Sequence, residues 1–258
     1  ACLAVKDHAD PDLANLCDEF AWIGIGSLGG AIRKYRKWGV QSAVMAGKIH
    51  KVLILRPGWW WRHRPDWRCI TAFSAQLITG AKDRNDDTLL LTLVDAFAAA
   101  GITFEPATDF APELLVPTGL VAGRPLSTRL ARDVEFGWRL AKHIGGLDIG
   151  QTVCVRNQGV LAVEAVEGTD QCIQRAGQLC KYSGFTVVKV AKPRQDMRFD
   201  VPTVGVKTLE SIASAGGQVL AIEGRRTIVL GADEFRRAAK RLKVSVIAID
   251  PAAEQAAA

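Results

Sequence analysis

The sequence predicts an α/β protein with two domains, on three observations. Helical and extended segments alternate in the N-terminal part, which favours parallel strands covered by helices. The run 111–127 is dense in proline and glycine and separates two such regions. The C-terminal part opens with a hairpin before strands and helices alternate again, which predicts a mixed sheet. We therefore place an N-terminal domain at 1–115, a linker at 116–127 and a C-terminal domain at 128–258.

Local patterns define the elements of the first domain. Apolar residues at helical spacing end at glycines, and short apolar runs between them are typical of buried strands. The expected elements are, in order, a loop at 21–30, a helix with a basic face at 31–38, a strand at 40–47, an irregular stretch at 56–67, a helix from Asp86 or Asp87 to Gly101, and a strand at 102–107.

The second domain is expected to open with a helix at Ser127, a good N-cap residue. The tetrapeptide RNQG at 156–159 suits a tight turn between two strands. The remaining expected elements are a helix at 170–181, a strand at 185–191, a strand at 203–206, a helix at 207–215, strands at 218–224 and 226–231, a helix at 232–242 and a strand at 244–250.

Composition limits the class of function. The chain has 258 residues, 48% of them hydrophobic, and a formal net charge of +6, which favours anionic partners. No apolar run is long enough for a membrane span, and no secretory signal is visible. The six cysteines include no CxxC pair, so we expect reduced thiols and a cytoplasmic protein.

A glycine-rich motif occurs near the N-terminus. The segment Gly24-Ile-Gly26-Ser-Leu-Gly29 matches the dinucleotide fingerprint, but the first acid after Glu19 is Asp66, too late to bind a ribose. The motif therefore does not predict a nicotinamide site. A phosphate at the following helix and a simple packed turn both remain open.

Tryptophan and arginine alternate in the stretch RPGWWWRHRPDWR, from Arg56 to Arg68. Tryptophan with arginine is typical of a membrane interface and also of a surface that stacks single-stranded nucleic acid. A loop whose rings fold back onto the domain explains the residues equally well. These three interpretations remain open.

Two acidic motifs lie at expected helix starts. Asp86 and Asp87 begin one helix, where capping explains one acid, and metal or ribose binding is an alternative for the other. Around the second, VEAVEGTD at 163–170, Thr169 or Asp170 is expected to cap the next helix. Convergence of carboxylates on a hard cation is the alternative there.

The segment KPRQDMRFDVPTVG at 192–205 is the richest in chemistry. The charge needed to neutralise a pyrophosphate is carried by Lys192, Arg194 and Arg198. Asp196 and Asp200 carry oxygens that suit Mg²⁺ or an attacking water. A surface loop with solvated ion pairs is the competing interpretation.

These segments resemble the LpxI family of UDP-2,3-diacylglucosamine pyrophosphatases. The resemblance rests on EGTD followed by AKPRQDMRFDVPTVG, on GIGSLGGAIRKYRKWGVQSAVMAGKI and on DDTLL, and it covers nearly the whole chain in order. It implies a Rossmann-like N-terminal domain and a ligand cleft between the domains. It also implies Mg²⁺-dependent hydrolysis of UDP-2,3-diacylglucosamine, with water attacking the α-phosphorus to give UMP and 2,3-diacylglucosamine 1-phosphate (lipid X) in lipid A biosynthesis.

The resemblance also assigns site residues. The family's essential aspartate falls on Asp200, and the expected metal ligands are Asp200 and Glu167. Further catalytic residues are expected at Asp196, Arg198 and Lys192. The expected substrate-binding residues are Gln195, Thr203, Thr169, Asp170, Gly26, Asp86 and Asp87.

The resemblance sets expectations for the chain's surroundings too. Family members begin with a strand and a GLIAGxGxLP-type turn, and this chain starts after them, so an incomplete N-terminal sheet is expected. We expect a lipid-linked substrate, peripheral contact with the inner membrane surface, a homodimer and no nucleic acid. The alternative function is a non-catalytic basic module that binds RNA or anionic lipid through Arg56–Arg68.

Overall fold

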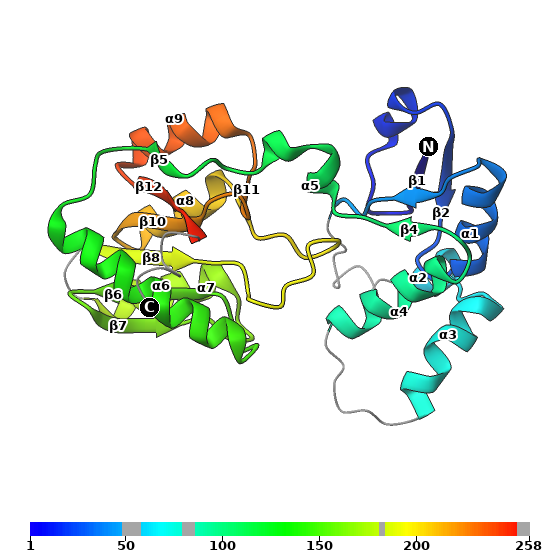
Figure 1. Cartoon of the computed structure of the whole chain (residues 1–258), viewed down its shortest axis with the longest axis horizontal. Coiled ribbons are helices and arrows are strands. Elements are labelled where there is room, and N and C mark those ends of the chain that lie inside the picture. The colour runs from blue at the N-terminus through cyan, green and yellow to red at the C-terminus, as the bar shows by residue number, and fades with distance from the viewer. Residues whose placement is uncertain (48–57, 79–85, 181–183, 252–258) are drawn as a thin grey trace. The chain divides into compact units, whose positions relative to one another are not determined.

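The computed structural model describes residues 1–47, 58–78, 86–180 and 184–251. They form two compact units, Ala1–Asp109 and Phe110–Ala258 (Figure 1). Each unit combines helices with strands, which confirms the predicted two-domain α/β organisation. None of the described helices combines the length and the apolar character needed to cross a bilayer.

The N-terminal unit contains two pairs of strands, and both pairs are parallel. Strand β1 pairs with β2, and β3 pairs with β4. The elements are β1 (Cys2–Val5), a 3-10 helix (Pro11–Leu16), β2 (Phe20–Ile23), α1 (Leu28–Lys37), β3 (Ser42–Ala43), α2 (Trp59–Arg62), α3 (Trp67–Ile78), α4 (Asp86–Ala98), β4 (Thr103–Phe104) and α5 (Ala107–Phe110).

Three local expectations for this unit were wrong. Strand β2 occupies the start of the segment where a loop was expected, because a four-residue strand gives too short a pattern to recognise, and β1 lies where no element was predicted. The stretch expected to be irregular forms α2 and the start of α3. The strand expected at 40–47 is confined to Ser42–Ala43 in the described part.

The glycine-rich turn packs against the segment that follows α2. A Cβ atom on Gly24 would lie 2.6 Å from the carbonyl oxygen of Arg62, and one on Gly26 would lie 2.5 Å from that of His63. The backbone N–H of Ile25 donates to Nδ1 of His63 at 3.1 Å, and His63 is only 1% exposed. The glycines are therefore required for close approach of two backbone segments.

We expect Gly26→Ala to lower the free energy of unfolding by about 1–3 kcal/mol, because the added methyl group meets backbone atoms that cannot rotate away. Urea denaturation followed by circular dichroism measures the change. Gly146→Ala is the matched control, since nothing lies within 4 Å of a Cβ at that position. Equal stability of the two variants would contradict the packing role of Gly26.

The C-terminal unit is built on a six-stranded mixed sheet in the order β5-β12-β10-β8-β6-β7. Strands β12, β10 and β8 are parallel, and β6 runs antiparallel to both β8 and β7. The strands are β5 (Gly119–Ala122), β6 (Thr152–Arg156), β7 (Gly159–Val163), β8 (Phe185–Lys189), β10 (Gly217–Glu223) and β12 (Ser245–Ile249). Strands β7, β8, β10 and β12 therefore end at the same edge.

Helices cover both faces of this sheet. Helix α6 packs its apolar stripe, Val134, Trp138 and Ala141, against one face, and α7, α8 and α9 bury the other. A Cβ on Gly137 would lie 2.7 Å from Val188, so α6 approaches the sheet closely. The helices are α6 (Thr128–Gly146), α7 (Thr169–Leu179), α8 (Val206–Ser214) and α9 (Ala232–Leu242), with a 3-10 helix at Pro112–Leu114.

Several predictions for this unit are confirmed. The Ser127 hydroxyl caps α6 by accepting from the N–H of Leu130 at 3.4 Å. Asn157 and Gln158 both adopt positive φ in the turn between β6 and β7, as a tight hairpin requires.

Other predictions need revision. Part of the expected linker at 116–127 forms β5, which pairs antiparallel with β12 and is therefore an edge strand of the sheet. The strands expected at 203–206 and 226–231 shrink to β9 (Thr203–Val204) and β11 (Ile228–Val229), which pair with each other. Gly168 occupies the N-cap position of α7, and the side chain of Thr169 bonds elsewhere.

Candidate active site

The edge where β7, β8 and β10 end collects most of the predicted site residues. In α/β sheets ligands bind outside the carboxyl ends of parallel strands, because the loops there converge and are free to vary. The segment 190–202 follows β8, and the segment 164–168 follows β7. The geometry of these two segments defines the candidate active site.

Asp200 is held by the loop that carries it. Its backbone N–H donates to the carbonyl of Asp196 at 2.9 Å, and its Oδ2 accepts from Nε2 of Gln195 at 2.7 Å. Oε1 of Gln195 in turn accepts from the backbone N–H of Lys192 at 2.8 Å. Asp200 is half-buried, and no contact to its Oδ1 is found within the described residues. One carboxylate oxygen is thus fixed while the other remains available to a ligand.

Two ion pairs involve the loop that carries Asp200. Arg198 donates from Nε and Nη2 to the carboxylate of Asp196, with Nη2–Oδ2 at 2.5 Å. These hydrogen bonds hold the pKa of Asp196 below its usual value. Lys192 Nζ lies 2.6 Å from Oδ1 of Asp148, which follows α6. The loop that carries Asp200 therefore also carries two cations, each paired with another carboxylate.

A buried polar chain links the ends of β7 and β8. Oγ1 of Thr169 donates to Oε1 of Glu164 at 2.9 Å, and Nζ of Lys189 donates to Oγ1 of Thr169 at 3.2 Å. Lys189 also reaches the carbonyl of Thr203 at 3.5 Å, and both Glu164 and Lys189 are under 10% exposed. The chain fixes Thr169 and Thr203, both predicted to bind substrate, at one edge of the sheet.

Glu167 is engaged by other groups. Its Oε1 accepts from Nη2 of Arg175 at 2.5 Å, and its Oε2 accepts from the backbone N–H of Ala165 at 3.1 Å. Backbone N–H groups, its own first, together with Arg175 hold its pKa below the usual value. Both oxygens therefore already accept hydrogen bonds, and metal binding by Glu167 stays a prediction.

Asp200 is suited to bind a divalent cation that is also coordinated by the substrate. Mg²⁺ is commonly bound by one or two carboxylates together with substrate phosphates and waters, so a complete protein cage is unnecessary. In the part of the chain that the structure describes, no group of three His, Cys, Asp or Glu side chains converges on one point. Asp200 is therefore the candidate protein ligand for such an ion.

Sequence reasoning missed a second buried charge pair at this edge. Glu223, the last residue of β10, is fully buried, and its Oε2 accepts from Nζ of Lys142 at 2.5 Å and from the N–H of Ala191 at 2.8 Å. Lys142 also donates to the carbonyl of Ala191 at 3.0 Å, and burial lowers its pKa. The pair therefore clamps both polar backbone groups of Ala191, one residue before the loop begins. The signal was a glutamate ending an otherwise apolar strand.

Asp170 and Gly26, both predicted to bind substrate, have other contacts. Asp170 is exposed and accepts from Oγ of Ser211 at 3.0 Å. Gly26 belongs to the N-terminal unit, where it packs against His63 and Pro65. Asp86 and Asp87 begin α4, as predicted, but their side chains lie outside the described part. Substrate binding by these four residues stays a prediction.

The fold and the site together define a class: two-domain α/β proteins in which one loop after a central strand of a mixed sheet carries an aspartate and two ion-paired cations. The comparisons with known proteins narrow this class to one family. The profile of the LpxI N-terminal domain matches residues 1–114, and that of the LpxI C-terminal domain matches residues 117–247. The chain belongs to the LpxI family, as the sequence motifs predicted.

A curated relative supports the same assignment. The chain is similar to the UDP-2,3-diacylglucosamine pyrophosphatase LpxI of Caulobacter vibrioides, with 30% identity over 260 residues. The match covers 97% of this chain and 89% of the relative. Both domains are therefore included in the similarity.

Proposed function

We propose that this chain hydrolyses the pyrophosphate bond of UDP-2,3-diacylglucosamine. The observation that carries the proposal is the similarity over 97% of the chain to a relative named for that activity. The available oxygen of Asp200, in the loop after β8, supports it independently. In the proposed reaction water attacks the α-phosphorus, and the products are UMP and 2,3-diacylglucosamine 1-phosphate.

Charge is the main obstacle to this reaction. A pyrophosphate diester carries two negative charges, which repel an incoming oxygen nucleophile. Lys192 and Arg198 lie in the same loop as Asp200, each paired with a carboxylate. We propose that they exchange those carboxylates for phosphate oxygens when substrate binds, so that one steadies the leaving phosphate.

Asp200 has two tasks in this proposal. Its Oδ2 remains on Gln195, which sets the orientation of the carboxylate, and its Oδ1 faces the reacting group. Asp200 would hold Mg²⁺ jointly with the substrate, and that ion would neutralise phosphate charge when bound. Thr169 and Thr203, fixed by Lys189, would line the site for the polar part of the substrate.

The direct test is product formation by the purified chain. With UDP-2,3-diacylglucosamine and Mg²⁺ in detergent micelles, we expect release of UMP, detected by chromatography. Removing divalent cations with EDTA should abolish the release, and added Mg²⁺ should restore it. Failure to release UMP under any divalent cation would reject the proposed activity, and undiminished release in EDTA would reject the role of the metal.

A further inference from the structure

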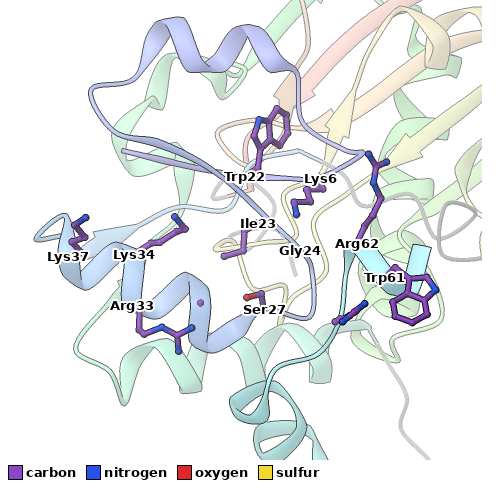
Figure 2. Close-up of a pocket in the computed structure, with 12 residues that line it drawn as sticks. Lys6, Trp22, Ile23, Gly24, Ser27, Arg33, Lys34, Lys37, Trp61 and Arg62 are labelled. Atoms are coloured by element: carbon purple, nitrogen blue, oxygen red, sulfur yellow. The ribbon is translucent and has the colours of Figure 1, made fainter. Parts of the chain in front are cut away.

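A basic pocket lies in the N-terminal unit, remote in sequence from the candidate active site. Its volume is about 490 Å³, which is within the range of small-molecule sites. Its polar lining includes Lys6 after β1, Arg33, Lys34 and Lys37 on α1, and Arg62 at the end of α2 (Figure 2). Arg64, two residues further on, also lines the pocket, and no acidic residue does so in the part of the chain that the structure describes.

The nearby carboxylates are occupied by other partners. Asp66 accepts from the N–H groups of Gly30 and Cys69 at 2.9 and 3.0 Å, and so caps α1 and the start of α3. Asp7 lies 3.2 Å from Nε2 of His63 and accepts from Arg62 at 2.7 Å, and these two contacts, that of His63 first, hold its pKa below the usual value. Asp66 therefore stabilises the walls of the pocket, and Asp7 pairs with one of the pocket cations, Arg62.

Most of the pocket cations lack a counter-charge. Within the described residues, no carboxylate forms an ion pair with Lys6, Arg33, Lys34 or Lys37. Like charges gathered around one hollow repel one another, and an anion bound between them removes that repulsion. The pocket is thus arranged for a ligand with more than one negative charge.

Two tryptophans supply an apolar side to the same pocket. Trp22 on β2 is 40% exposed and Trp61 on α2 is 72% exposed, and both line it. The guanidinium of Arg64 stacks over the Trp61 ring at 4.3 Å, which orients the ring. Exposed aromatic faces beside cations suit a ligand that carries an apolar or planar group next to its phosphate.

We infer that this pocket binds a phosphate-bearing group, either the diphosphate of a soluble nucleotide or the headgroup of an anionic phospholipid. The inference concerns the N-terminal unit alone and does not depend on the proposed hydrolysis. Lys6, Arg33, Lys34 and Lys37 neutralise the phosphate charge, and Trp22 and Trp61 contact the group attached to it.

Binding to the full chain tests the inference, in EDTA so that turnover does not interfere. The probes are UDP and inorganic pyrophosphate, followed by calorimetry, and vesicles of neutral or anionic phospholipid, followed by co-flotation. The variant is Arg33→Gln/Lys37→Gln on the exposed face of α1. The matched control is Lys240→Gln/Arg241→Gln, which removes the same charge from the exposed face of α9.

We expect the α1 variant to weaken binding about tenfold or more, because two charges next to the ligand are lost, while the control binds like the parent chain. If the α1 variant loses binding of UDP and pyrophosphate, the phosphate group that the pocket binds belongs to a soluble nucleotide. If it loses only binding to anionic vesicles, the phosphate group belongs to a lipid. Lys6→Gln, in the segment after β1, should weaken binding of the same probe. The inference is overturned if no probe binds, or if the α1 and α9 variants bind alike.

Discussion

Replacement of Asp200 by asparagine is expected to lower kcat about a thousandfold. The amide keeps the shape of the side chain, and its oxygen can still accept from Nε2 of Gln195, so the loop should stay in place. What is lost is the negative charge and the available oxygen, both needed to hold a divalent cation. Initial rates of UMP release under saturating substrate measure the effect.

The control for Asp200→Asn is Asp233→Asn. Asp233 is an exposed aspartate in the first turn of α9, paired only with Arg236 among the described residues. Its replacement should leave turnover and melting temperature unchanged, and Asp200→Asn should keep the melting temperature too. Turnover of Asp200→Asn within tenfold of the parent would remove Asp200 from the mechanism.

Replacement of Lys142 by methionine is expected to lower the free energy of unfolding by about 3–5 kcal/mol, because it leaves the buried carboxylate of Glu223 without the cation that hydrogen-bonds to it. Arg226 remains as an ion-pair partner, but its Nη1 lies 3.7 Å from Oε1, too far for a hydrogen bond. Loss of the clamp on Ala191 should also lower kcat, since the loop that holds Asp200 begins at the next residue. Urea denaturation and UMP release measure the two effects.

The double variant Lys142→Met/Glu223→Leu separates two effects of the pair: the cost of a buried, uncompensated charge and the positioning of the Ala191 backbone. Removing both partners should recover most of the stability, because no buried charge is left uncompensated. Turnover should stay low, since the Ala191 carbonyl and N–H still lack their partners. Lys240→Met on α9 is the matched single control and should change stability by less than about 0.5 kcal/mol. Full activity in the double variant would show that the clamp has no role in the site.

The sequence alone determined the family and the polar loop. The segment 192–205 combines lysine, arginines, aspartates and Pro-Thr at fixed spacing, so its identity did not depend on any long-range contact. Most elements of the C-terminal unit were predictable for a similar reason. Local sequence determines three of them: the N-cap at Ser127, the turn at Asn157–Gln158 and the apolar stripe of α6.

Only the tertiary structure decided how those residues are partnered. Glu167 and Glu164 cannot be told apart by their sequence context. In the structure Glu167 accepts a hydrogen bond from Arg175, whereas Glu164 accepts from Thr169, which is in turn bonded to Lys189. The clamp joins Lys142 to Glu223, and the basic pocket combines residues from β2, α1 and α2 with Lys6, which follows β1. Such pairings depend on which strands and helices become neighbours, and local residue patterns carry no information about contacts between distant segments.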